Sequence, residues 1–128
     1  MLAEMSETID VIVPRGGKGL VKKVQDMARI PVIGHLDGIC HVYVNKSADL
    51  NIAIKVIHNA KLRRTEICGA AETLLIDKEF ADKNLKEIVT SLYESGCEIR
   101  GDDLSRKLDD RITIASESDW ETEYLDAI

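Results

Sequence analysis

Residues 63–77 read RRTEICGAAETLLID and change character twice along their length. A basic pair comes first, then Cys68 with small neighbours, and then the run ETLLID at 72–77. An apolar run of this length is typical of a short buried strand. Before the stretch, apolar residues from Leu50 to Ala60 recur at helical spacing. Cys68 is therefore predicted to lie on a connection between a helix and a strand, where functional residues concentrate.

The same alternation of strand-like and helix-like segments continues on both sides. Apolar and β-branched runs predict strands, and amphipathic runs predict helices. Strands are expected at 8–14, 30–35, 39–45 and 72–77, with short ones at 97–101 and 111–115. Helices are expected at 19–29, 49–61, 78–95 and 102–108. This order predicts an α/β fold in layers, with a mostly parallel sheet and flanking helices.

Two of the predicted helices carry an apolar stripe that should face the core. In 19–29 the stripe is Leu20, Val21, Val24, Met27 and Ala28, and in 78–95 it is Phe80, Leu85, Ile88, Val89 and Leu92. Asp49 is predicted to cap the helix that follows it, and Gly96 to end the helix that precedes it.

The composition indicates a globular protein of one domain. The chain has 128 residues, 45% hydrophobic and 31% charged, with a net charge of −6. That charge argues against a nucleic-acid surface, which needs a basic patch. No segment resembles a signal peptide or the roughly 20 apolar residues of a membrane span. Cys40, Cys68 and Cys97 fit neither a disulfide framework nor a zinc site, so reduced thiols and a cytoplasmic location are expected.

The glycine-rich segment RGGKG at 15–19 lies between a predicted strand and a predicted helix. Backbone N–H groups at a helix N-terminus can bind phosphate, which makes Gly16 and Gly17 candidates. The spacing matches neither the P-loop nor GxGxxG, so a tight turn is the simpler interpretation.

Two interpretations of Cys68 remain open on the local sequence. As a nucleophile, it would have room beside Gly69 and two alanines, and Arg63 and Arg64 would favour the thiolate, whereas Glu66 would oppose it. As a structural residue, it would be a small buried thiol, the common fate of a free cysteine. Cys40 alternates as a strand residue and is predicted to lie in the core.

The remaining polar groups suggest no metal site. The histidines, His35, His41 and His58, lack metal-ligand spacing, and no metal is expected. The aspartate pairs 102–103 and 109–110 are predicted to be solvated turns and helix caps.

Three segments in order, IDVIVPRGGKGL, IPVIGHLDGICHVYVNKSADL and HNAKLRRTEICGAAETLLID, resemble the gamma-glutamyl phosphate reductase family of the aldehyde dehydrogenase superfamily. The similarity is dense from about residue 8 to 78 and continues more weakly to the tail WETEYLDAI. The family reduces gamma-glutamyl phosphate to glutamate-5-semialdehyde in proline biosynthesis, with NADPH as the hydride donor. The resemblance implies that Cys68 is the nucleophile that forms a thioester, and that Gly16 and Gly17 approach the cofactor.

Two departures from the family affect this interpretation. Family members are several times longer, so residues 1–34 would be the last strand–helix unit of a nucleotide-binding domain. Residues 35–128 would then be the first part of the catalytic domain, the two forming one compact unit. Most of the NADPH site would lie outside the chain. The second departure is Glu66, where the family has a small residue. The alternative to an enzyme is a truncated, non-catalytic relative that forms an oligomer or binds a complementing chain.

Overall fold

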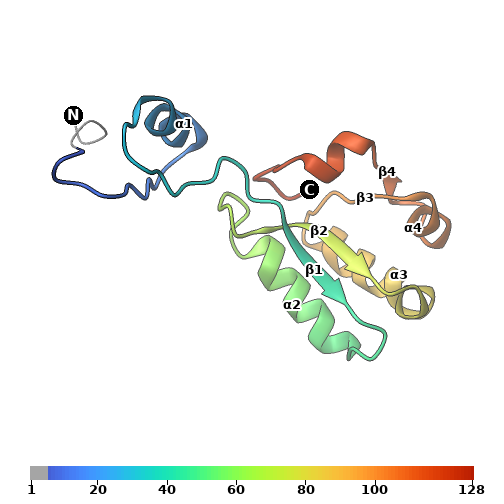
Figure 1. Ribbon diagram of the computed structural model, residues 1–128. Helices are drawn as coiled ribbons and strands as arrows, with labels where there is room; N and C mark the ends of the chain where they lie inside the picture. The colour runs from blue at the N-terminus through green and yellow to red at the C-terminus, as the bar shows by residue number, and fades with distance from the viewer. Residues whose placement is uncertain (1–5) are drawn as a thin grey trace. The chain divides into compact units, whose positions relative to one another are not determined.

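The computed structural model describes residues 6–128 and divides into two compact units, Met1–Gly38 and Ile39–Ile128 (Figure 1). The division lies four residues after the boundary expected from the sequence, and the contacts form two units where one was expected. The assignment of these parts to a nucleotide-binding and a catalytic domain stays a prediction. Each unit is built from helices and parallel strand pairs, so the expected α/β class is confirmed.

The first unit contains one helix, α1 (Lys18–Met27), between two extended segments. These segments meet at a single parallel bridge between Ile12 and Val32, where Ile12 N–H donates to the Pro31 carbonyl at 3.0 Å. The strands expected at 8–14 and 30–35 are thus reduced to one residue pair. Pro14 and Pro31 lack the N–H that a longer ladder would need.

The apolar stripe of α1 is only partly buried within the described residues. Val21 is buried as predicted, but Leu20 and Met27 are 52% and 53% exposed. One short helix with two extended segments offers too little surface to cover the whole stripe. The prediction that this stripe faces a core is therefore wrong for these two residues.

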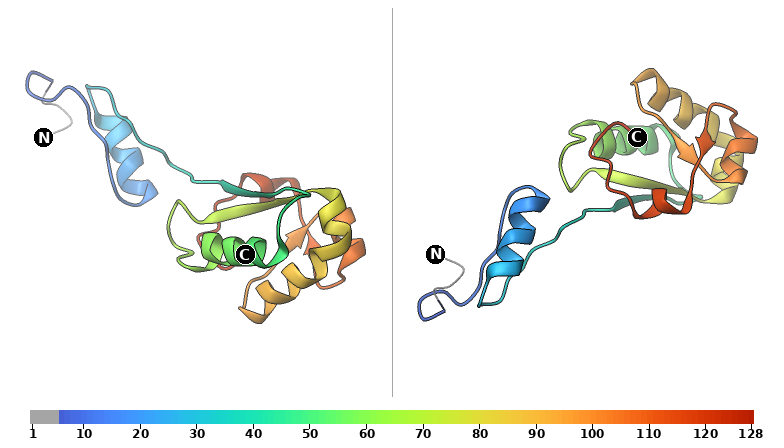
Figure 2. Two further views of the ribbon diagram at one scale, coloured as in Figure 1. Left: turned by 90° about the horizontal axis from the view of Figure 1, so that it is seen from below. Right: turned by 90° about the horizontal axis from the view of Figure 1, so that it is seen from above.

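The second unit begins with a strand–helix–strand motif. Strand β1 (Cys40–Val44) pairs in parallel with β2 (Ala71–Ile76), and α2 (Leu50–Leu62) connects them and packs on both. Figure 2 shows α2 along one side of the strand pair. The Asp49 side chain accepts a hydrogen bond from Ile52 N–H at 3.0 Å, which confirms the predicted cap.

Helix α3 (Lys78–Glu94) supplies much of the core of this unit. All five residues of its predicted stripe are buried, and Ile88 is 1% exposed. Gly96 follows the helix with φ +80°, a conformation that favours glycine, and this confirms the predicted stop. The core combines α3 with Val44, Ala53, Ile57 and Cys97.

The C-terminal part of the unit contains a second parallel pair, β3 (Arg100–Gly101) with β4 (Thr113–Ile114). Helix α4 (Asp103–Leu108) connects them, and a 3-10 helix, η2 (Glu117–Glu121), follows. Asp102 caps α4 by accepting from Ser105 N–H at 2.8 Å, as predicted for this aspartate pair. The C-terminal tail contacts the segment around β3. The Arg100 guanidinium lies 5.1 Å from the centre of the Tyr124 ring, and Glu98 N–H donates to the Ala127 carbonyl.

The prediction that the aspartate pair 109–110 is solvated is wrong for Asp109. The residue is 2% exposed, and its carboxylate accepts from the Arg111 guanidinium at 2.6 and 2.9 Å. These hydrogen bonds hold the pKa of Asp109 below its usual range. An aspartate can be buried here because its cation lies two residues away and hydrogen-bonds it twice.

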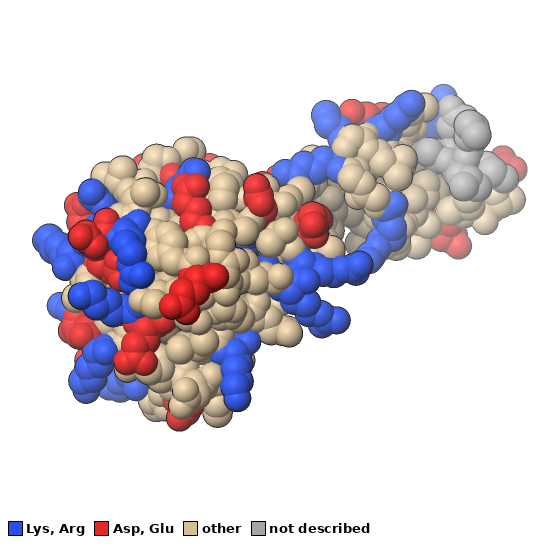
Figure 3. Space-filling model, turned by 180° about the vertical axis from the view of Figure 1, so that it is seen from behind, with Lys and Arg blue, Asp and Glu red and all other residues tan. Residues whose placement is uncertain are grey.

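Acidic and basic side chains are intermixed over the face of residues 39–128 seen in Figure 3. Among residues 6–128, no helix combines the length and the apolar character required to span a membrane.

Candidate functional site

The candidate nucleophile Cys68 lies on the loop 63–70, which joins the end of α2 to the start of β2. This is the connection predicted from the sequence. The loop contains turns but no helix or strand, and Ala70 N–H closes one turn on the Ile67 carbonyl at 2.9 Å. Cys68 is exposed, so the interpretation of it as a buried core thiol is not supported. Its role as a nucleophile stays a prediction.

Cys40 contacts the backbone of Cys68. Its thiol donates a hydrogen bond to the Cys68 carbonyl, with 3.4 Å between Sγ and O. Cys40 is exposed, so the prediction that it lies in the core is wrong. It is the first residue of β1, where the register with β2 is irregular, and the alternation along the strand does not extend reliably to this position. No local sequence pattern predicted this contact, which joins residues 28 positions apart.

Two backbone N–H groups beside the candidate nucleophile are without a hydrogen-bond acceptor in the part of the chain that the structure describes. They belong to Cys68 and Gly69. A Cβ added to Gly69 would meet no atom within 4 Å, so the space beside this backbone is open. Backbone N–H groups close to a nucleophile can stabilise the oxyanion that forms when it attacks a carbonyl. The loop therefore combines an accessible thiol with two such donors.

The charged residues of the loop are all exposed. Arg63 and Arg64 follow α2, and Glu66 lies two residues before Cys68. Exposed charges act weakly on one another, but they do affect the approach of a charged reagent.

The effect of Glu66 can be measured with two alkylating reagents of different charge. We expect Glu66→Gln to raise the ratio of the iodoacetate rate to the iodoacetamide rate at Cys68 by about 1.5- to 5-fold, since exposed charges interact by about 0.2–1 kcal/mol. Iodoacetate is an anion and iodoacetamide is neutral, so the ratio isolates electrostatic repulsion. Glu87→Gln, on α3 outside the loop, should leave the ratio unchanged. An equal ratio in wild type and Glu66→Gln would contradict the repulsion.

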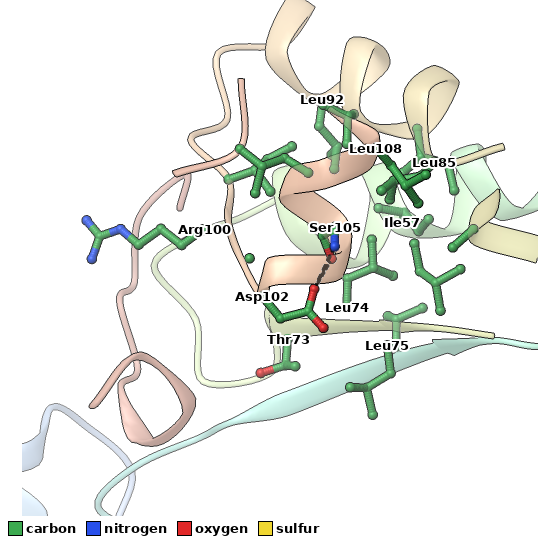
Figure 4. Close-up of a pocket in the computed structure, with 18 of the residues that line it drawn as sticks. Ile57, Thr73, Leu74, Leu75, Leu85, Leu92, Arg100, Asp102, Ser105 and Leu108 are labelled. Atoms are coloured by element: carbon green, nitrogen blue, oxygen red, sulfur yellow. Dashed lines mark hydrogen bonds between the residues drawn. The ribbon is translucent and has the colours of Figure 1, made fainter. Parts of the chain in front are cut away.

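A cavity of the second unit lies away from the candidate nucleophile. It has a volume of about 480 Å³ and is lined by β2, α3, α4 and the segment around β3. Leu74, Leu75, Leu85 and Leu108 line it, and Asp102 and Ser105 hydrogen-bond to each other beside it (Figure 4). Cys68 is not among its lining residues. The cavity is an apolar groove and has no contact with the candidate nucleophile.

A buried ion pair connects the groove to the Cys68 loop, and the sequence analysis missed it. Lys61 in the last turn of α2 donates to Glu72 in β2 at 2.7 Å, and the side chains are 8% and 1% exposed. The two residues flank the loop on either side. Leu125 N–H of the tail also donates to Glu72, at 3.4 Å.

The other residues singled out from the sequence belong to the first unit or have partners outside the Cys68 loop. Gly16 has φ +152° and Gly17 caps the N-terminus of α1, both in the first unit. The His58 ring lies 2.8 Å from the Ser91 hydroxyl, and the His41 ring lies 2.8 Å from the Ile39 carbonyl. Among residues 6–128, no group of histidine, cysteine or acidic side chains has the geometry of a metal site.

Comparison with solved structures defines the class of fold. Betaine aldehyde dehydrogenase from Staphylococcus aureus, solved in complex with NAD⁺, matches with a TM-score of 0.58 and 17% identity, over 79% of this chain and 20% of that one. At this identity the likeness concerns the fold alone. No family model matches the chain. The chain therefore has the fold of part of an aldehyde dehydrogenase, as predicted.

Both the sequence and the structure are similar to one enzyme of this fold, gamma-glutamyl phosphate reductase. The crystal structure of that reductase from Thermotoga maritima matches with a TM-score of 0.90 and 41% identity, over 98% of this chain and 30% of that one. The reductases of Methylobacterium nodulans and Rhodopseudomonas palustris are each 56% identical over 128 residues. The predicted resemblance is confirmed along the whole chain, which spans about 30% of the length of these curated relatives.

Proposed function

We propose that this chain provides the nucleophile segment of a gamma-glutamyl phosphate reductase acting in the cytoplasm in proline biosynthesis. The main support is 56% identity to such reductases over the whole chain, combined with an accessible cysteine on the α2–β2 loop. In this proposal Cys68 is the catalytic residue, and gamma-glutamyl phosphate is the substrate.

The chemistry assigned to the chain is acyl transfer to sulfur. The Cys68 thiolate attacks the acyl carbon of gamma-glutamyl phosphate, a C–S bond forms, and the C–O bond to phosphate breaks, which gives a thioester and free phosphate. The N–H groups of Cys68 and Gly69 are positioned on the same loop to donate to the carbonyl oxygen as negative charge develops. Formation of a thioester divides one difficult displacement into two easier steps.

The cofactor requires residues beyond those that the structure describes. NADPH, when bound, supplies the hydride that converts the acyl group to the aldehyde. Among residues 6–128, the N–H groups near Gly16 and Gly17 fit part of such a ligand, because they start α1 and no atom lies within 4 Å of a Cβ built on Gly17. The apolar groove offers no comparable phosphate site. The remaining cofactor contacts are therefore assigned to segments that the longer relatives carry.

The proposal is tested by a chimera in which this chain replaces the matching segment of the Methylobacterium nodulans reductase. Glutamate-5-semialdehyde, phosphate and NADP⁺ are supplied, and NADPH absorbance is followed in the reverse direction. We expect turnover within about tenfold of the parent reductase, and none from the chain alone at the same concentration. A folded chimera without turnover would contradict the proposal.

The apolar groove favours a second function, the binding of a complementing chain or of a second copy. β2 pairs only with β1 among the described residues, and Leu75 on β2 is 46% exposed beside the groove. A strand edge without a paired neighbour, next to apolar surface, is a typical site for the addition of a further strand. This function and the enzymatic one are compatible, because the relatives are longer than this chain.

A further inference from the structure

Cys40 and Cys68 lie close together although they are 28 residues apart in the sequence. The Cys40 Sγ is 3.4 Å from the Cys68 carbonyl oxygen. A carbonyl oxygen is at most about 2.8 Å from its own Cα, so the sulfur of Cys40 is within about 6 Å of the Cys68 Cα. This contact joins the Cys40 thiol to the Cys68 backbone, so a disulfide requires in addition a rotation of the Cys68 side chain and a shift of the exposed loop to a Cα separation of roughly 4.4–6.8 Å.

The three cysteines differ in exposure and in hydrogen bonding, and these differences indicate which thiols can be oxidised. Cys40 donates a hydrogen bond to the Cys68 carbonyl and is the first residue of β1. Cys68 is exposed on a loop without regular structure. Cys97 is 4% exposed, and burial raises the pKa of its thiol. Accessible thiols next to a second thiol are the ones that oxidise reversibly, whereas a buried thiol reacts slowly.

We propose that Cys40 and Cys68 form a reversible oxidation site, in which hydrogen peroxide converts the two thiols to a disulfide. The Cys68 thiolate attacks hydrogen peroxide, the O–O bond breaks, and Cys68 becomes a sulfenic acid, while the released hydroxide takes up the proton lost by the thiol and leaves as water. Cys40 then attacks this sulfur, the S–S bond forms, and a second water leaves. The two sulfurs lose two electrons in total, and the peroxide gains them. A dithiol reductant reverses the reaction by exchange.

The disulfide would have two consequences for the candidate site. It removes the free thiol from Cys68, so an acyl phosphate can no longer be attacked. It also stops the oxidation of Cys68 before the irreversible sulfinic acid. The first consequence rests on the proposed function, whereas the formation of the disulfide does not.

The test uses the chain itself, treated with hydrogen peroxide, blocked with iodoacetamide and digested with trypsin. Each cysteine lies on its own tryptic peptide, 30–46 for Cys40, 65–78 for Cys68 and 87–100 for Cys97. We expect the loss of two alkylated thiols, a cross-linked pair of peptides 30–46 and 65–78, and full recovery after dithiothreitol. Cys97→Ser should give the same cross-link. In Cys40→Ser, excess peroxide should carry Cys68 on to sulfinic acid.

Two results would overturn the proposal: sulfinic acid on Cys68 with Cys40 still alkylated in the wild type, or cross-links found only in dimers. The active chimera separates this proposal from the proposed function. If turnover of the chimera needs Cys68 but no cross-link forms, only the proposed oxidation site is contradicted. If the cross-link forms but the chimera is inactive, the proposed catalytic function is contradicted and the oxidation site is supported.

Discussion

Replacement of Cys68 by serine in the chimera is expected to lower turnover by about 10³-fold or more, since a serine hydroxyl is a poor nucleophile without an activating base. No histidine lies on the loop 63–70 to act as that base. The assay is NADPH formation from glutamate-5-semialdehyde, phosphate and NADP⁺. Cys97→Ser is the matched control, because that thiol is buried in the core and does not lie on the loop.

Retention of more than about a tenth of the turnover by Cys68→Ser would contradict a covalent role, because the loss of a nucleophile costs orders of magnitude. A second readout requires no cofactor. In the chain alone, iodoacetamide should label Cys68 faster than Cys40, although both are exposed, and Cys97 slowest. Equal slow labelling of all three would count against a reactive site on this loop.

The helices and strands around this loop could be predicted because local patterns determine them. The stripe of α3, the Asp49 cap and the glycine after α3 follow from periodicity and from the preferences of single residues. The predicted place of Cys68, between a helix and a strand, follows from the same patterns. The fold class was therefore accessible from the sequence.

The errors have a common cause, which is that burial depends on what else is present. Leu20 and Met27 form a regular stripe in α1, but the first unit has too little surface to cover them. Asp109 is buried because Arg111 folds back on it, and Cys40 is exposed because it begins the strand. The contact of Cys40 with Cys68 joins distant parts of the sequence, so no local pattern could indicate it.

The ion pair of Lys61 and Glu72 is expected to be the most sensitive polar contact for stability. Both side chains are nearly buried, so removal of one charge leaves the other without compensation in the interior. We expect Glu72→Gln to lower the free energy of unfolding by about 3–5 kcal/mol, the usual cost of breaking a buried pair. Urea denaturation followed by Trp120 fluorescence measures this, because the only tryptophan lies in the same unit.

The matched control removes the same charge from an exposed pair. Lys46 and Glu79 are 3.9 Å apart with side chains 59% and 73% exposed, so Glu79→Gln should cost less than about 1 kcal/mol. The double variant Lys61→Met with Glu72→Leu should be far more stable than Glu72→Gln, because it removes both charges and keeps the apolar volume. If Glu72→Gln and Glu79→Gln cost the same, the burial of the pair has no energetic consequence. If the prediction holds, the pair fixes the ends of α2 and β2, and the position of the Cys68 loop depends on it.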